Sequence, residues 1–219
     1  MTITAGGPTP SHLNPQAPQG PALYLASRSP RRRLMLTEAG IPHDTLDAGV
    51  DDGILLQGRV TPDAWVLALA YLKARAGLAR LAASDPTPVL GADTVIDKAG
   101  RVIGQPRDHQ HAREIIHALR DGSHRVITGV AVVTHDPTVP TATRRALLLD
   151  AATVTLGHIT DHDIDRYVQS ESWRGKAGGY NFSERHAAGW PITCDGDPTT
   201  VMGLPMTRLP RWLQTALAP

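Results

Sequence analysis

The sequence predicts an α/β protein in which helices pack on a mixed β-sheet. Two observations lead to this fold class. Capped helical stretches alternate with short apolar strands, and several strands follow one another with only a turn or loop between them. Strands joined directly favour antiparallel pairing, so a purely parallel, doubly wound sheet is not expected. A length of 219 residues suits one compact domain, or one domain with two lobes.

Residues 1–21 are expected to form a disordered tail in front of a single domain over residues 22–219. The tail contains no Lys, Arg, Asp or Glu, and eight of its residues are Gly or Pro. It lacks the basic start and apolar middle of a secretory signal, and also the arginines of a transit peptide.

The first ordered elements form a strand-to-helix turn. Residues 22–27 are short and apolar and predict a buried strand. Ser29 stands at an N-cap position and Pro30 at the first helical position, so a helix follows over residues 31–39 and ends at Gly40. The turn therefore gathers Ser27, Arg28, Ser29, Arg31 and Arg32.

A second cap and proline, Thr61-Pro62, predict a long helix that runs to about Ala83. Its apolar stripe is predicted from helical spacing and comprises Trp65, Leu69, Leu72, Ala76 and Ala79. Lys73 falls at the border of this stripe.

The remaining elements follow from the same signals. Strands are predicted at 88–96, 101–104, 124–135 and 145–159. Helices are predicted at 108–120 and 207–217. A further helix begins at Thr160, which forms a capping box with Asp163. From about Ser170 to the last helix the chain is expected to be irregular. Turns facing a ligand are expected at Gly91, Gly175, Gly178 and Gly203.

Composition excludes several classes of function. The formal charge of +1 argues against a protein that binds nucleic-acid polymers, and 4% aromatic residues argue against a stacking platform for single strands. The longest apolar runs are too short to span a bilayer, and one cysteine, Cys194, excludes an internal disulfide or a multi-thiolate zinc site. We therefore expect a soluble, cytoplasmic protein with a small-molecule partner and no membrane partner.

Two candidate sites emerge from the residues alone. The hydroxyls and guanidiniums of residues 27–33 surround a helix N-terminus, which suits a polyphosphate; the alternative is that Ser29 only caps the helix and the arginines are solvated. Asp93 lies in an apolar strand, so it must be paired, bound to metal or at a cleft. Asp51 and Asp52 could join it around Mg²⁺, or form a solvated loop.

A third, weaker signal is the glycine-rich segment 175–180, which lets the backbone approach a phosphate while Lys176 neutralises it. The alternative is that this segment is an ordinary flexible glycine loop that binds no ligand.

Taken in order, six segments together resemble the Maf family of nucleoside triphosphate pyrophosphatases, which is also associated with septum formation. These segments are LYLASRSPRRRLML, Val50-Asp51-Asp52, Lys73-Ala74-Arg75-Ala76, GADTVI, GKAGGY and VMGLPM. The resemblance runs from about Leu23 to the C-terminus.

The resemblance implies a fold similar to the inosine-triphosphate pyrophosphatases, with two lobes around a cleft and often a dimer. It implies cleavage between the α and β phosphates, with Mg²⁺ as the metal and Mn²⁺ as the alternative. Asp93 would be the proton acceptor and, with Asp52, a metal ligand. The expected substrate contacts are Ser27, Ser29, Arg31, Arg32, Lys73, Thr94, Gln105 and Lys176.

Departures from the family pattern leave the base unassigned. The segment Gly104-Gln105-Pro106 has Gln where members usually have Lys, and Asn181 to Glu184 lacks the Gln of the dTTP/UTP-cleaving branch. Asp197-Pro198 is more similar to the branch that cleaves 7-methyl-GTP, whereas Lys176 is similar to the dTTP/UTP-cleaving branch. The alternative function is a nucleotide-binding regulator of cell division with little turnover; Asp93 favours the enzyme and Gln105 the regulator.

Overall fold

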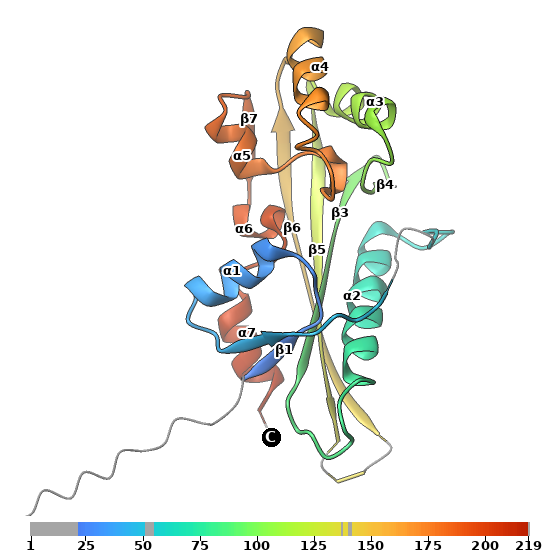
Figure 1. Cartoon of the computed structure of the whole chain (residues 1–219), viewed down its shortest axis with the longest axis vertical. Helices are drawn as coiled ribbons and strands as arrows, with labels where there is room; N and C mark the ends of the chain where they lie inside the picture. Colours follow the sequence, from blue (N-terminus) through green and yellow to red (C-terminus); the bar gives the residue numbers. More distant parts are fainter. Residues whose placement is uncertain (1–21, 51–54, 137, 140–141, 219) are drawn as a thin grey trace, which may run out of the picture.

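The computed structural model of the chain describes residues 22–50, 55–136, 138–139 and 142–218. The predicted tail over 1–21 and the predicted metal residue Asp52, with Asp51, lie outside the described residues. Long strands run the length of the molecule, and helices gather around their two ends as two lobes (Figure 1). No helix within the described ranges is long and apolar enough to cross a membrane.

The strands form one mixed seven-stranded sheet, which confirms the predicted fold class. The strands are β1 (Leu23–Leu25), β2 (His43–Thr45), β3 (Val89–Lys98), β4 (Arg101–Ile103), β5 (Gly122–His135), β6 (Thr143–Leu156) and β7 (Ile192–Asp195). Their order is β2-β1-β3-β5-β6-β7, with β4 also paired to β3. The pairs of β1 with β2 and β3 are parallel, whereas β3, β5, β6 and β7 pair antiparallel.

The α-helices are α1 (Pro30–Glu38), α2 (Pro62–Leu78), α3 (His109–Leu119), α4 (Asp161–Gln169), α5 (Phe182–Ala187), α6 (Pro198–Met202) and α7 (Leu209–Ala216), with a short 3₁₀ turn, η2 (Ala177–Gly179). The first four, α1 to α4, begin where the sequence predicts. Ser29, Thr61, Asp108 and Thr160 each accept a hydrogen bond from the first turn of their helix. The region after Ser170, expected to be irregular, contains α5, β7 and α6.

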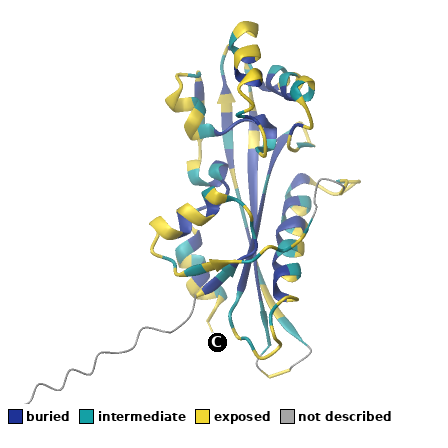
Figure 2. Ribbon diagram, in the orientation of Figure 1, coloured by how far each residue is buried: buried dark blue, intermediate teal, exposed yellow. Residues whose placement is uncertain are grey.

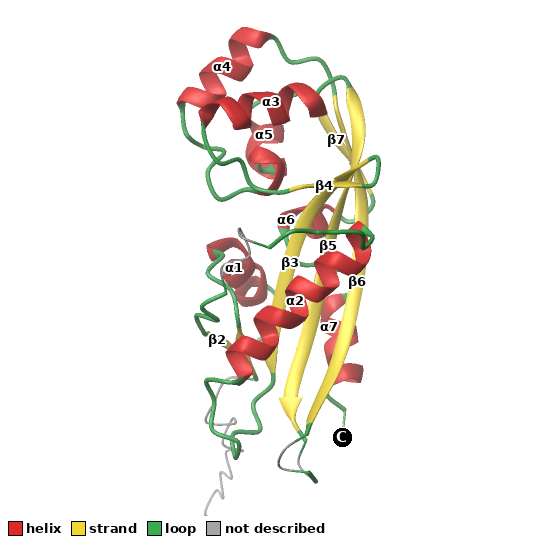
Figure 3. Cartoon of the chain, turned by 90° about the vertical axis from the view of Figure 1, so that its right-hand side faces the viewer, coloured by secondary structure: helices red, strands yellow, loops and turns green. Residues whose placement is uncertain are grey.

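Helices cover both faces of the sheet. One face carries α2, and the other carries α1 and α7 in one lobe and α3 and α4 in the other (Figures 1 and 3). The central strands β3 and β5 are mostly buried, whereas much of β6 and the outward faces of the helices are exposed or half-buried (Figure 2).

The predicted apolar stripe of α2 is correct only in part, because Leu69 is buried whereas Leu72 is 40% exposed. The helix ends at Leu78 rather than near Ala83, and its buried side is formed by Val66, Leu69, Ala70, Ala74, Gly77 and Leu78. Small residues, Ala70 and Ala74, stand where the helix backbone lies directly on the sheet.

Gly91 allows α2 to approach the sheet this closely. It was predicted to lie at a turn, and this prediction is wrong. It lies inside β3, and a Cβ there would stand 2.3 Å from the Ala70 carbonyl oxygen and 2.5 Å from the Ala74 nitrogen. Gly129 of β5 meets the backbone of Val66 in the same way, at 2.8 Å. The two glycines let the α2 backbone rest on the strands.

A gap in the sheet edge separates the two lobes. On one side, β3 pairs with β1 at residues 89–90 and with β4 at residues 96–98. Between these pairings, residues 91–95 meet no other strand of the described chain on that side. The middle of β3 therefore presents its edge to the space between the lobes, and Asp93 lies at the centre of this stretch.

Candidate active site

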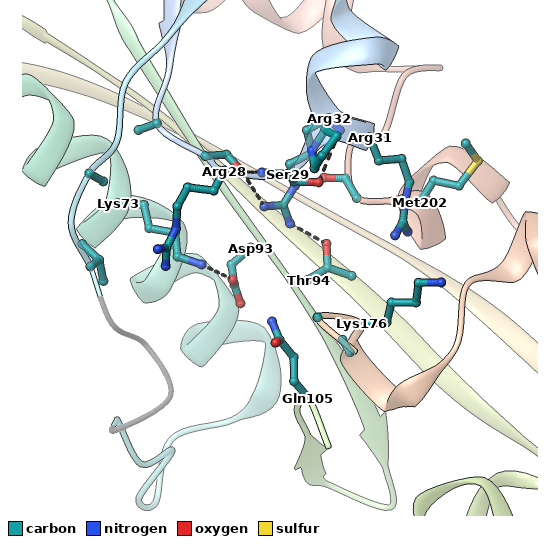
Figure 4. Close-up of a pocket in the computed structure, with 18 of the residues that line it drawn as sticks. Arg28, Ser29, Arg31, Arg32, Lys73, Asp93, Thr94, Gln105, Lys176 and Met202 are labelled. Atoms are coloured by element: carbon teal, nitrogen blue, oxygen red, sulfur yellow. Dashed lines mark hydrogen bonds and ion pairs between the residues drawn. The ribbon is translucent and has the colours of Figure 1, made fainter. Parts of the chain in front are cut away.

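A cavity of about 570 Å³ opens at this gap. It is walled by the turn between β1 and α1, the edge of β3, the middle of α2, and segments 47–50 and 174–177. Figure 4 shows side chains converging on it from both lobes. The residues of the sequence prediction that line it are Ser27, Ser29, Arg31, Arg32, Lys73, Asp93, Thr94, Gln105 and Lys176. All the predicted site residues that the structure describes are thus brought together.

Asp93 is held by an ion pair at the wall of the cleft. Lys73 Nζ lies 2.6 Å from Asp93 Oδ1, with side-chain exposures of 15% and 11%. Gly91 and Asp93 share one face of β3, and α2 rests on that face, so the helix brings Lys73 over the carboxylate. A carboxylate that is nearly buried yet open to a cleft suits acid–base chemistry or metal binding.

Arg32 is buried and its donors are used within the protein. Its Nε donates to the Gly203 carbonyl oxygen at 2.9 Å, and its terminal nitrogens donate to the Ala92 carbonyl oxygen at 2.8 Å and to Thr94 Oγ1 at 3.1 Å. Ser27 Oγ accepts a further bond at 3.3 Å. The guanidinium therefore fastens α1 to the edge of β3 and to the turn after α6, in addition to any contact with a ligand.

Thr94 is part of a directed chain of hydrogen bonds. Thr128 Oγ1 donates to the Thr200 carbonyl oxygen at 2.7 Å, so Thr94 is the donor in its 2.8 Å contact with Thr128. The lone pairs of Thr94 Oγ1 then accept from Arg32. The hydroxyl of Thr94 therefore positions Arg32 at the cleft wall.

Two further arginines point into the cleft without such partners. Neither Arg28 nor Arg31 makes a side-chain hydrogen bond to any residue in the described part of the chain, and both line the cavity. Figure 4 shows Arg28 on the side of Lys73 and Arg31 on the side of Lys176 and Met202. Burial lowers the pKa of Arg31, an effect that the carboxylate of Glu184 opposes. Their donors are positioned to bind anions.

Lys176 and Gln105 enter from the other lobe on two segments tied together. Gly178 N donates to the Gly104 carbonyl oxygen at 2.8 Å, and a Cβ at Gly178, which has φ of 66°, would stand 2.0 Å from Ile96 Cδ1. Lys176 Nζ forms an ion pair with Glu184 of α5. Gln105 points toward Asp93 from across the cleft (Figure 4).

Some participants were not expected from the sequence. Glu184 was noted only as a departure from the family pattern, and its pairing with Lys176 depends on how α5 folds back after the glycine turn. Asp47 lines the cavity although no local signal marks it, and Met202, which belongs to the segment VMGLPM but was assigned no role, lines it too. Asn181 caps α5 and also donates to Glu184 Oε1 at 2.8 Å, which fixes this carboxylate.

The donor set fits a hard cation only in combination with a ligand. Within the described ranges, no three His, Cys, Asp or Glu side chains gather as a metal site. Mg²⁺ in phosphate sites, however, uses one or two carboxylates and takes its other ligands from phosphate oxygens and water. Asp93 can supply such a carboxylate, so the residues present fit a metal that arrives with a phosphorylated substrate.

Comparison with known proteins gives consistent relatives. A family model described as Maf-like protein matches residues 22–216. A dTTP/UTP pyrophosphatase of Alkalilimnicola ehrlichii is 38% identical over 190 residues, which cover 85% of this chain and 88% of that protein. A dTTP/UTP pyrophosphatase of Salinibacter ruber is 37% identical over 207 residues, covering 94% and 96%.

A solved nucleoside-triphosphatase, or dITP/XTP pyrophosphatase, of Mycobacterium abscessus matches with a TM-score of 0.35 and 14% identity. The match covers 63% of this chain and 74% of that one.

Proposed function

The chain belongs to the Maf-like family, and on that basis we propose that it is a nucleoside triphosphate pyrophosphatase. The products would be a nucleoside monophosphate and pyrophosphate, from hydrolysis between the α and β phosphates. The observation that carries the proposal is the Lys73–Asp93 pair, which places a carboxylate at the edge of β3 in a basic cleft.

The chemistry assigned to the chain has three parts. Arg31, Lys176 and the first turn of α1 neutralise the phosphates, since cations and helix N-termini both attract them. Asp93 accepts a proton from the water that attacks phosphorus. The bond to the bridging oxygen then breaks, and its electron pair leaves with pyrophosphate.

A divalent cation fits this scheme. Mg²⁺, or Mn²⁺ in its place, would be held by Asp93 and by substrate oxygens, and would neutralise charge on the phosphates. Asp52, which the sequence also assigned to the metal, lies outside the described residues and stays a prediction.

The names of the relatives point to pyrimidine substrates. Both relatives described above are named dTTP/UTP pyrophosphatases, so we propose dTTP and UTP for this chain. Gln105 is the departure that bears on this assignment, because it replaces a lysine that the family usually has and it faces Asp93 (Figure 4).

A panel of ordinary and modified triphosphates with Mg²⁺ tests the activity by release of pyrophosphate. We expect turnover of dTTP and UTP, and a loss of about 100-fold or more in Asp93→Asn, the range typical of a general base. Asp195→Asn, on an exposed carboxylate of β7, is the matched control. Binding of nucleotides without any release of pyrophosphate would support the regulator alternative instead.

A further inference from the structure

We propose that Arg28, which the family motif leaves unassigned, binds the terminal phosphates of the substrate and the pyrophosphate product. The inference rests on the proposed function and adds a residue to its substrate contacts. Arg28 stands between Ser27 and Ser29 in the turn from β1 to α1 and lines the cleft.

The cations of the cleft differ in how they are already engaged. Arg32 donates to four protein acceptors, Lys73 pairs with Asp93, and Lys176 pairs with Glu184. Arg28 is exposed and its guanidinium makes no hydrogen bond to any other residue of the described ranges. Five N–H donors in a planar fork are therefore presented beside the ion pair of Lys73 and Asp93, as Figure 4 shows.

The lining of the cleft gives the substrate a direction. Its apolar residues include Ile96, Val126 and Tyr180, which belong to the core of the lobe that carries Lys176. A base or sugar buries its apolar surface most favourably at that end. The phosphate next to the sugar then stays within reach of Arg31 and Lys176, and the terminal phosphates extend toward the opposite end, where Arg28 lies.

The cavity also continues beyond Arg28. A second hollow of about 150 Å³ is lined by Ser27, Arg28 and Asp47, which also line the main cleft, and by Arg33, which does not. The end of the cleft at Arg28 is thus open and basic. A triphosphate whose α phosphate lies at Asp93 has room there for its β and γ phosphates.

Arg28 and Arg31 accordingly have different tasks. Arg31 faces the side of Lys176 and Met202, near the apolar end, whereas Arg28 faces the side of Lys73 (Figure 4). Removal of Arg28 should weaken binding of pyrophosphate and leave binding of the nucleoside monophosphate intact.

Titration calorimetry with inorganic pyrophosphate and, separately, with uridine monophosphate tests this assignment on the full chain with Mg²⁺. We expect Arg28→Gln to weaken pyrophosphate binding about tenfold or more, while the affinity for the monophosphate stays within about twofold. Arg28→Lys should fall between, because an ammonium keeps the charge but loses the planar fork. Arg211→Gln, on the exposed side of α7, removes the same charge away from the cleft and should match the wild type.

Three results would overturn the assignment. They are wild-type protein that does not bind pyrophosphate, unchanged pyrophosphate affinity in Arg28→Gln, and an equal loss for both ligands. Release of pyrophosphate from UTP by the wild type is measured in parallel. Binding of pyrophosphate through Arg28 without any turnover would contradict the proposed function and support this assignment. Turnover of UTP together with unchanged pyrophosphate affinity in Arg28→Gln would support the proposed function and contradict this assignment.

Discussion

The ammonium of Lys73 lies 2.6 Å from a carboxylate oxygen of Asp93, and this contact joins the middle of α2 to the gap in the sheet edge. Both side chains are nearly buried, so each neutralises a charge that would otherwise be costly to remove from water. The pair therefore serves stability as well as the proposed chemistry.

Substitution of one partner should be more harmful than substitution of both. We expect Lys73→Met and Asp93→Asn each to lower the free energy of unfolding by about 2 kcal/mol, because each removes one half of a nearly buried ion pair. The double variant should lose less than the sum of the two, by about 1 kcal/mol or more. Urea unfolding of the four proteins gives the coupling energy, and strictly additive losses would show that the contact contributes nothing to stability.

Gly91 allows that contact, and its replacement tests whether the seating of α2 controls the site. Gly91→Ala puts a methyl group 2.3 Å from the Ala70 carbonyl oxygen, so we expect a loss of about 3 kcal/mol as the helix is forced away. Pyrophosphate release should fall more than the folded fraction, because Lys73 moves with the helix.

Gly122→Ala is the matched control for this substitution. Gly122 also lies in a strand, β5, but the nearest atoms to a Cβ there are at 3.8 and 3.9 Å. We expect its stability and activity to be close to those of the wild type. Equal stability of Gly91→Ala and Gly122→Ala would contradict the packing argument.

Arg31 and Arg32 are neighbours with different tasks, and the conservative change to lysine separates them. Arg32→Lys cannot reach Gly203, Ala92 and Thr94 at once, so we expect about 2 kcal/mol lower stability together with lower activity. Arg31→Lys should leave the unfolding temperature close to that of the wild type and raise KM by about tenfold, as expected for loss of a bidentate phosphate contact.

Thermal unfolding and steady-state kinetics of the two variants decide between these tasks. A stability loss confined to Arg31→Lys, or equal effects of the two changes, would show that the hydrogen bonds of Arg32 are not what distinguishes them.

Local chemistry explains why much of the fold could be predicted. Helix starts at Ser29, Thr61, Asp108 and Thr160 depend on a side chain and a backbone N–H two or three residues away, so the sequence alone carries the signal. The long strands follow from continuous apolar runs. The site residues were predicted to lie together because six segments occur in the same order as in the Maf family.

What could not be predicted depends on contacts between distant segments. The buried side of α2 is set by the glycines of β3 and β5, which the helix sequence does not record. The bond from Arg32 to Gly203 joins residues 171 positions apart. The helices α5 and α6 were missed because elements of six and five residues are too short to show helical periodicity.

His124 gives the molecule a dependence on pH that does not involve the reacting groups. Its Nε2 lies 2.7 Å from the hydroxyl of Tyr180, whose ring lines the cleft, and its Nδ1 is buried without a partner among the described residues. Burial, helped by the charge of Lys98, lowers the pKa of His124 from 6.5 to about 4. The folded protein therefore keeps this ring neutral under conditions that protonate it in the unfolded chain.

Stability should consequently fall as the pH falls between 6.5 and about 4. The unfolded state binds the extra proton in this window, and by about pH 5 the difference amounts to about 2 kcal/mol. Replacement by glutamine, which cannot titrate but can still bond to Tyr180, should remove this part of the slope. Urea unfolding at about pH 7 and about pH 5 measures the difference between wild type and His124→Gln. His162→Gln, on the exposed side of α4, should retain the wild-type slope, and the same slope in His124→Gln would mean that this histidine is not responsible.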